Sequence, residues 1–175
     1  MRTPIVMTFI GHDRPGLVNA ISEKVSAAGG TWLESRLARL AGEFAGVVLV
    51  EVPETNIAAL TAALVDLEAT GLRVAVERSS GAEPPRSRQI VRLELLGNER
   101  PGIVRDVTQA LTQLGVNIEE FSSSLEDAPF SGAVMFRASA RLGVPDDLAS
   151  DELRKTLERL AAEIMVDLTV TSGDP

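Results

Sequence analysis

The chain has 175 residues and a net charge of −8, with 45% hydrophobic residues, 3% aromatic residues and no cysteine. The lack of cysteine excludes disulfides, thiol nucleophiles and cysteine-ligated metals, and no apolar run approaches the ~20 residues that a membrane helix needs. Residues 1–85 carry a charge of −3 and residues 86–175 a charge of −5, so neither half offers the concentrated basic face that nucleic-acid binding requires. We therefore expect a globular, cytoplasmic protein that contacts neither membrane nor nucleic acid directly.

The first predicted element is a strand over residues 4–10, PIVMTFI. One arginine precedes it and no small-residue cleavage site follows, so the segment does not resemble a signal peptide. Its residues are nearly apolar on both faces, whereas a strand with one solvated face alternates between apolar and polar residues. We expect the outer face of this strand to be covered by the other half of the chain or by another subunit.

A polar loop, GHDRPG at residues 11–16, leads from this strand into a predicted helix. Apolar residues recur at helical spacing from Leu17 to Val25, and Gly29 stands where a helix C-cap glycine belongs. The remaining predicted elements of the first half are strands at residues 31–42 and 43–52, a helix at about 55–69 and a strand at 72–77. A segment rich in Ser, Pro, Gly and charge follows, and we expect domains at residues 1–78 and 89–175 joined by a linker at 79–88.

The second half repeats the first. IGHDRPGLV at residues 10–18 returns as LGNERPGIV at 96–104, an offset of 86. We expect the same register to continue without a gap through the pairs Gly29 and Gly115, Glu34 and Glu120, Phe44 and Phe130, Gly46 and Gly132, and Val48 and Val134. The predicted elements are strands at 90–96, 116–127, 129–140 and 164–171 and helices at 103–114 and 150–163, the latter with Ser150 as N-cap. Strand, helix, strand, strand, helix, strand in each half predicts an α+β chain of two tandem ferredoxin-like βαββαβ domains, each an antiparallel sheet with its helices on one face.

The repeated loop is the candidate binding site, and two explanations of it stay open. Asp13 or Glu99 can cap the following helix, a proline suits the first turn, and a glycine leaving the strand permits a sharp turn. A glycine within the first turn, however, costs ~0.5–1 kcal/mol, so its presence in both copies suggests that a ligand approaches the backbone there. Helix N–H groups and the loop arginines suit a carboxylate, and the loop acids suit an ammonium group, so that a zwitterionic amino acid would satisfy the whole set.

The two loops, each between a strand and a helix of a βαββαβ unit, resemble the ligand loop of ACT domains. LGVNIEEF at residues 114–121 also matches that family, with Asn117 opening the second strand. Two tandem copies resemble the glycine cleavage system transcriptional repressor family. The resemblance implies amino-acid binding at interfaces between sheets or domains, by Gly11, His12, Asp13, Arg14, Pro15, Gly16, Leu17, Gly97, Asn98, Glu99, Arg100, Pro101, Gly102, Ile103 and Asn117. The copies differ at His12 and Asn98 and at Thr31-Trp32 and Asn117-Ile118, so the two sites can differ in ligand, or one can be vestigial.

Other candidate sites are weaker. His12 is the only histidine and has no neighbouring ligand cluster, so we expect no metal site, and its counterpart Asn98 cannot share acid–base chemistry. Ser122–Ser124 lack a partner that would activate a nucleophile, Trp32 is expected to pack in the core, and Asp146-Asp147 are expected to cap the last helix. We find no phosphate-binding loop, dinucleotide-binding pattern or triad spacing, and expect neither cofactor nor enzymatic activity.

The sequence therefore predicts a regulatory homo-oligomer that senses an amino acid, with glycine as the first ligand to test. Because no DNA-reading element is visible, regulation is expected to pass through contact with another protein, such as a DNA-binding regulator. Two alternatives remain: a structural dimerisation module without ligand, or the detached regulatory part of an amino-acid enzyme.

Overall fold

The computed structural model describes residues 1–79, 88–128 and 133–172. The chain divides into two compact units, Met1–Glu83 and Pro84–Pro175, which are described separately below. The predicted linker lies almost wholly outside the described residues, as do Phe130 and Gly132. None of the helices in the described ranges is long and apolar enough to cross a membrane.

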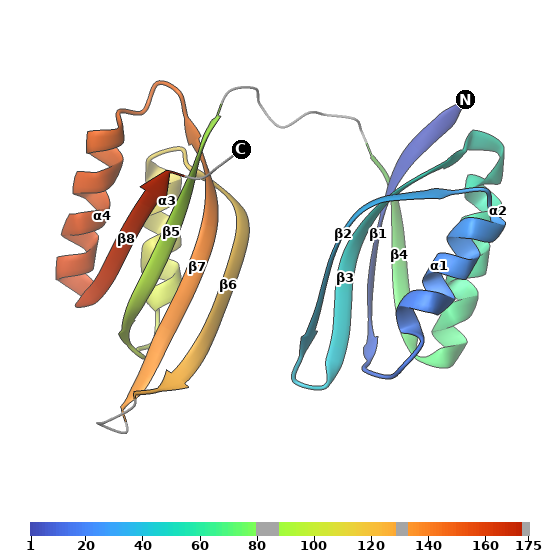
Figure 1. Cartoon of the computed structure of the whole chain (residues 1–175), viewed down its shortest axis with the longest axis horizontal. Helices are drawn as coiled ribbons and strands as arrows, with labels where there is room; N and C mark the ends of the chain where they lie inside the picture. Colours follow the sequence, from blue (N-terminus) through green and yellow to red (C-terminus); the bar gives the residue numbers. More distant parts are fainter. Residues whose placement is uncertain (80–87, 129–132, 173–175) are drawn as a thin grey trace. The chain divides into compact units, whose positions relative to one another are not determined.

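The first unit contains a four-stranded antiparallel sheet in the order β2-β3-β1-β4 (Figure 1). Its elements are β1 (Arg2–His12), α1 (Leu17–Ala27), β2 (Thr31–Leu40), β3 (Glu43–Pro53), α2 (Ile57–Val65) and β4 (Leu72–Arg78). The predicted helix at residues 55–69 is α-helical only over α2, because 3₁₀ turns, η1 (Glu54–Asn56) and η2 (Asp66–Thr70), flank it on both sides.

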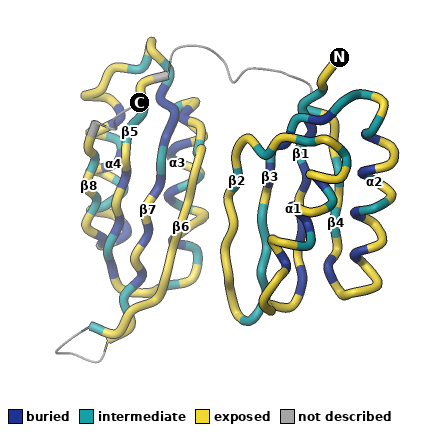
Figure 2. Tube along the Cα trace, turned by 45° about the vertical axis from the view of Figure 1, so that its right-hand side comes forward, coloured by how far each residue is buried: buried dark blue, intermediate teal, exposed yellow. Residues whose placement is uncertain are grey.

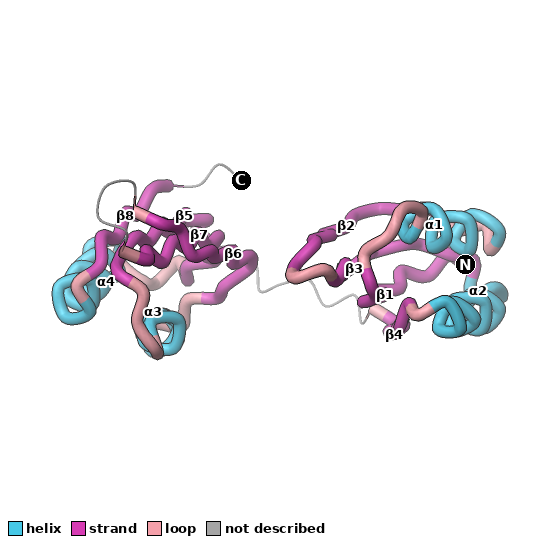
Figure 3. Tube along the Cα trace, turned by 90° about the horizontal axis from the view of Figure 1, so that it is seen from below, coloured by secondary structure: helices cyan, strands magenta, loops and turns pink. Residues whose placement is uncertain are grey.

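The second unit has the same order of elements, and its sheet runs β6-β7-β5-β8. Its elements are β5 (Arg88–Asn98), α3 (Ile103–Gln113), β6 (Asn117–Asp127), β7 (Val134–Pro145), α4 (Ser150–Ile164) and β8 (Val166–Ser172). In each unit both helices lie on the same side of the strands (Figure 3). The prediction of two ferredoxin-like α+β domains is confirmed.

Each domain buries its own core between helices and sheet, and buried positions follow the inward faces of both (Figure 2). In β1 the side chains of Ile5, Met7 and Phe9 are at most 3% exposed, while the intervening residues point away from the helices. The largest fully buried side chains of the second core are Leu111, Leu142 and Leu157. Both cores consist of hydrophobic residues, and no polar or charged residue of the described ranges is buried.

Helix ends agree in part with the sequence. Gly29 and Gly115 both follow a helix with φ of 68°, in the left-handed region that glycine favours, as predicted. The N–H of Gly30 closes the end of α1 by donating to the Val25 carbonyl at 2.8 Å. The prediction of Ser150 as N-cap is wrong, because Ala149 occupies that position with extended backbone and no side-chain hydrogen bond caps α4, by Asp146-Asp147 or any other residue.

The ungapped register between the halves is also wrong beyond the second strand. Phe44 pairs with Gly11 and Phe136 pairs with Gly97, so the counterpart of Phe44 is Phe136, at an offset of 92 rather than 86. By the same pairing Val48 corresponds to Ala140 rather than to Val134, and Gly46 to Ala138 rather than to Gly132. The physical reason is a longer connection between β6 and β7 than between β2 and β3, since a hairpin tip accepts insertions without disturbing the ladder.

Candidate functional site

Gly11 and Gly97 are the last core-facing residues of β1 and β5, and each lies very close to the start of the last strand of its domain, β4 or β8. A Cβ atom at Gly11 would lie 2.8 Å from the Gly71 carbonyl oxygen, and one at Gly97 would lie 2.4 Å from the Val166 Cγ1. Neither glycine has a positive φ. They are required by close strand packing, and not by the sharp turn that the sequence suggested.

Gly16 and Gly102 stand one residue before α1 and α3, as their N-caps, and not inside the first turn. Their φ angles are 94° and 89°, in the left-handed region that strains any L-residue with a side chain. Local backbone conformation therefore accounts for both glycines without a ligand. The predicted side-chain caps are wrong, since neither helix has a side-chain hydrogen bond at its N-cap.

The same conformation leaves the first backbone N–H groups of α1 and α3 without side-chain acceptors, because N-terminal N–H groups have no partner within the helix. The two helix ends differ in how open they are. At Gly16 no atom lies within 4 Å of the position of a Cβ, whereas at Gly102 the Nη2 of Arg105 lies 3.1 Å from it. The start of α1 is open to an incoming group, and the start of α3 is partly covered by Arg105.

The two loop arginines have different partners. Arg14 donates from Nη2 to the carbonyl oxygen of Thr70 at 2.8 Å, and no ion pair to it is found among the described residues. Arg100 instead donates from Nη2 to the Oδ2 of Asp106 at 2.7 Å. Asp106 also accepts from the Nη2 of Arg105 at 2.8 Å, and these two arginines, Arg105 foremost, hold the pKa of its carboxyl below 3.8. Arg100 therefore has a carboxylate partner, which it shares with Arg105, whereas Arg14 has none among the described residues.

The acidic and polar loop residues are also differently engaged. Asp13 forms an ion pair with Arg39 at 2.7 Å, and His12 Nδ1 lies 2.7 Å from Glu43 Oε1 with an 89% exposed side chain. Glu99 makes a backbone hydrogen bond to Val134 at 3.0 Å, and its side chain is exposed with no ion pair to the described residues. Within the described residues, the first loop thus has an arginine without an acidic partner, and the second loop has an acid, Glu99, without a basic partner.

Asn117 lies far from the loop of its own domain. It pairs with Gly143, which pairs with Ile90 near the start of β5, while Gly97 lies near the other end of β5, opposite Phe136. Seven residues of strand separate the two ends, or about 23 Å at ~3.3 Å per residue. Within the second domain, the structure does not bring Asn117 together with residues 97–103.

The remaining predicted residues lie at the edges of the loops. Pro15 and Pro101 precede the N-cap glycines and are exposed, and Asn98 is exposed at the end of β5. Leu17 and Ile103 open the helices and are buried in the cores, at 5% and 4% exposure. Their side chains are core residues, and only their backbone faces the loops.

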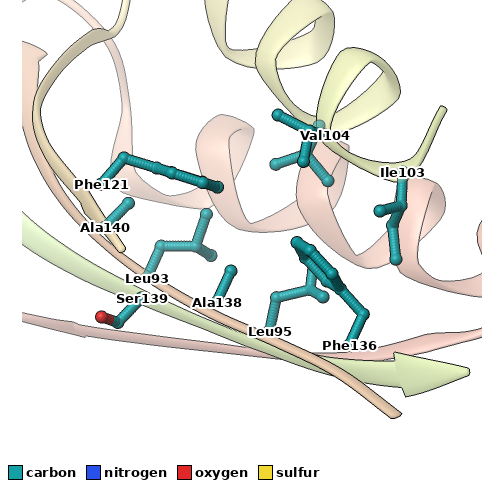
Figure 4. Close-up of a pocket in the computed structure, with 10 residues that line it drawn as sticks. Leu93, Leu95, Ile103, Val104, Phe121, Phe136, Ala138, Ser139 and Ala140 are labelled. Atoms are coloured by element: carbon teal, nitrogen blue, oxygen red, sulfur yellow. The ribbon is translucent and has the colours of Figure 1, made fainter. Parts of the chain in front are cut away.

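An apolar hollow that no sequence motif indicated lies between α3 and the sheet of the second domain (Figure 4). Its volume is about 250 Å³ including open solvent, and very little of that space is wide enough for a water molecule. Phe121 and Val104 lie at one side of it, with Ala138 and Ala140 on its floor. In the first domain the counterpart of Ala140 is Val48, which is fully buried, so the smaller side chain of Ala140 leaves space in the second domain. Every lining residue except Ser139 is apolar, and the hollow suits at most a methyl-sized group.

Comparison with known proteins agrees with this geometry. The sequence model of the ACT domain family matches residues 3–77 and 89–171. Phosphoserine phosphatase SerB2 of Mycobacterium tuberculosis is 30% identical over 176 residues, which cover 97% of this chain and 41% of that protein. The glycine cleavage system transcriptional repressor of Escherichia coli is 24% identical over 162 residues, covering 91% of this chain and 85% of that one. The crystal structure of an unknown protein from Galdieria sulphuraria superposes with a TM-score of 0.83 and 29% identity, covering 99% of this chain and all of that one.

Proposed function

Since the chain belongs to the ACT domain family, built as two tandem domains, we propose that it is a non-catalytic regulatory protein that binds the carboxylate of an amino acid at the loop between β1 and α1. The observation that carries this proposal is the combination of an uncapped, open helix start at Gly16 with the unneutralised guanidinium of Arg14. Backbone N–H groups at a helix N-terminus and an arginine are both suited to a carboxylate.

The proposal assigns different roles to the two loops. At α3, Arg105 partly covers the helix start, and Asp106 already occupies Arg100 with its own carboxylate. A ligand carboxylate there would compete with Asp106 in the same chain, whereas at α1 it would meet no such competitor. The first loop is therefore the binding loop. In the second loop, Asp106 already accepts a hydrogen bond from Arg100, the counterpart of Arg14.

The ligand's ammonium group binds an acceptor outside the first loop, because the carboxylate of Asp13 is already paired with Arg39. In this proposal a second polypeptide or domain completes the site, which couples ligand binding to assembly. Glycine is the first ligand to test because the Escherichia coli relative is a glycine cleavage system transcriptional repressor. A net charge of −8 makes contact with another regulator protein the favoured route of action.

Isothermal titration calorimetry of the folded chain against glycine, serine, alanine, valine and aspartate tests the proposal. We expect one amino acid to bind with heat that scales with protein concentration, and the corresponding amino alcohol, which lacks the carboxylate, not to bind. If every amino acid fails while circular dichroism shows a folded protein, ligand sensing is wrong and a structural dimerisation module remains.

A second candidate is the regulatory part of an amino-acid enzyme. It is favoured by the 30% identity to the phosphatase SerB2, of whose length the chain spans 41%. The size of the native polypeptide, measured by immunoblot, separates the two candidates. A band near 18.6 kDa favours an independent regulator, whereas a much larger polypeptide that hydrolyses phosphoserine favours the enzyme.

A further inference from the structure

The outer face of the first sheet, opposite its helices, carries an apolar patch. Because strand side chains alternate, the residues between the buried ones of β1 and β3 point outward. Paired positions place Thr8 beside Val47 and Ala75, Ile10 beside Ala45, and Val6 beside Leu49. Together with Ala38 of β2, which pairs with Ala45, these eight residues form what we call the outer patch. Val47 and Ile10 are 48% and 38% exposed, so the patch is open in the isolated domain.

The corresponding face of the second sheet is polar, which shows that the fold does not require an apolar outer face. Val47 corresponds to Ser139, Thr8 to Glu94, Leu49 to Arg141 and Val6 to Arg92, since each occupies the same place in its ladder. Ion pairs lie across this face, such as Arg137 to Glu126 at 3.0 Å. The polar outer face of the second sheet does not complement the outer patch. The molecule that covers the outer patch must therefore present an apolar surface of its own.

The outer patch itself is such a surface, and the charges at its border favour a second copy. Arg73 pairs with Ile10 and Glu77 pairs with Val6, so β4 carries a cation at one end of the patch and an anion at the other. Both side chains are exposed, and neither forms an ion pair with a described residue. A two-fold axis through the row of Val47, Thr8 and Ala75, lying across the strands, places Arg73 of one copy opposite Glu77 of the other. At the opposite edge of the sheet, Arg36 of β2 lies on the axis and faces Arg36 of the other copy. Its charge is balanced by Glu34, whose Oε1 lies 3.0 Å from its Nη1.

We propose that two copies of the chain stack the outer faces of their first sheets on each other about this axis. Sheets that pack face to face keep their strands within about 30° of one another, which leaves long side chains such as Arg73 and Glu77 within reach. The surface is self-complementary, as a two-fold interface requires. This proposal concerns assembly alone and stands whether or not the chain binds an amino acid.

The size of the patch sets the strength of the contact. Four strands ~4.8 Å apart and five residues of ~3.3 Å give a face of about 19 by 17 Å, or about 650 Å² for both copies. Stable interfaces bury ~1,200–2,000 Å² in total, so this contact falls below that range and is weak and reversible. We expect a dissociation constant of about 10–100 μM.

Sedimentation velocity of the full chain from about 5 to 500 μM tests the proposal. The wild-type chain is expected to shift reversibly from monomer to dimer with concentration. Val47→Glu places a charge at the centre of the patch and is expected to weaken dimerisation at least 10-fold. Ser139→Glu introduces the same charge at the matching position of the second sheet and is expected to leave it unchanged. A chain that stays monomeric throughout, or a Val47→Glu variant that dimerises like the wild type, overturns the proposal.

Charge reversal tests the axis and does not depend on how Val47→Glu folds. Arg73→Glu and Glu77→Arg are each expected to weaken the dimer about 5-fold in low salt, because each puts like charges opposite one another. The double variant restores the opposite-charge contact, and its dissociation constant is expected to return to within about 2-fold of the wild type. If the double variant is as weak as the single ones, the two copies do not pair about this axis. If dimerisation survives all three changes, a different face holds the copies together.

Discussion

Arg100 and Asp106 form a 2.7 Å ion pair that the first domain lacks. The residue in the place of Asp106 there is Ala20, and Arg14 reaches the carbonyl of Thr70 instead. A repeated motif, identical in four of its six residues, therefore produces one arginine that is paired with a carboxylate and one that has no acidic partner among the described residues. The difference arises from residues outside the motif, and it decides which loop is available to an anion.

The Asp106 ion pairs are expected to make the second domain sensitive to acid. Its pKa is lowered in the folded protein, so its stabilisation is fully present above its ordinary value of 3.8 and is lost as pH falls through the lowered pKa. Asp106→Asn is expected to be less stable than the wild type at pH 7, and this difference is expected to shrink as the pH falls below 3.8. Thermal unfolding at several pH values measures this difference.

A comparison between variants is needed because Glu54 also has a lowered pKa, through its hydrogen bond from Thr3 and the charge of Arg78. Both groups contribute to acid unfolding of the wild type, but only the Asp106 contribution disappears in Asp106→Asn. A gap between the two proteins that stays constant with pH would contradict the expectation.

Arg14→Ala is expected to weaken binding of the amino acid about 10-fold or more, because a charge-assisted contact to the carboxylate is lost. Arg100→Ala, at the matching position of the second loop, is expected to change affinity less than about 2-fold. Calorimetric titration of both variants with the amino acid found for the wild type gives the answer. Equal losses in the two variants would assign binding to both loops, and a loss in Arg100→Ala alone would contradict the proposed site.

Gly16→Ala is expected to destabilise the first domain by about 1–2 kcal/mol, because alanine is strained at a φ of 94°. Gly16→Asn is expected to cost less, since asparagine tolerates the left-handed region better than alanine does. Urea denaturation followed by amide NMR signals assigns the loss to one domain. Alanine and asparagine variants of equal stability would mean that φ is not what requires glycine here.

The floor of the hollow offers a paired test of packing. Ala140→Val adds two carbons where the hollow has room for about one, so the neighbouring side chains must accommodate the other, and we expect a stabilisation of less than about 1 kcal/mol. Val48→Ala, the reverse change at the matching position, removes a fully buried side chain and is expected to cost about 2 kcal/mol. Domain-resolved urea denaturation measures both. A destabilised Ala140→Val variant would show that the hollow is too tight for two more carbons.

The fold could be predicted because the two halves of the chain carry the same pattern of apolar residues and glycines, so each half supports the assignment of elements in the other. Helical spacing from Leu17 and Ile103 and the glycines at 29 and 115 place the same elements in both halves, and the structure confirms them. The length of a hairpin loop is not fixed by such a pattern. An alignment by residue identity therefore paired Phe44 with Phe130, whereas its structural counterpart is Phe136. Only pairing against Gly11 and Gly97 reveals the shift.

The site was less predictable, because its properties depend on contacts that the motif does not encode. Glycine is required at position 16 because of the φ angle there. Arg100 is paired with a carboxylate because Asp106 lies one helical turn into α3. Asn117 follows the loop closely in sequence but lies at the other end of the sheet, since α3 spans the length between them. The hollow arises where Ala140 replaces a larger residue, a difference that is visible only once the register is known.

The contrast between the outer faces of the two sheets has a consequence for growth of an assembly. A chain with an apolar face on each of two domains has two places of attachment, and such chains link without limit into filaments or aggregates. Here the face that holds Val47 is apolar and the face that holds Ser139 is polar. Stacking through the first sheets therefore stops at a dimer. The charged residues on the outer face of the second sheet prevent further copies from adding there by the same apolar contact.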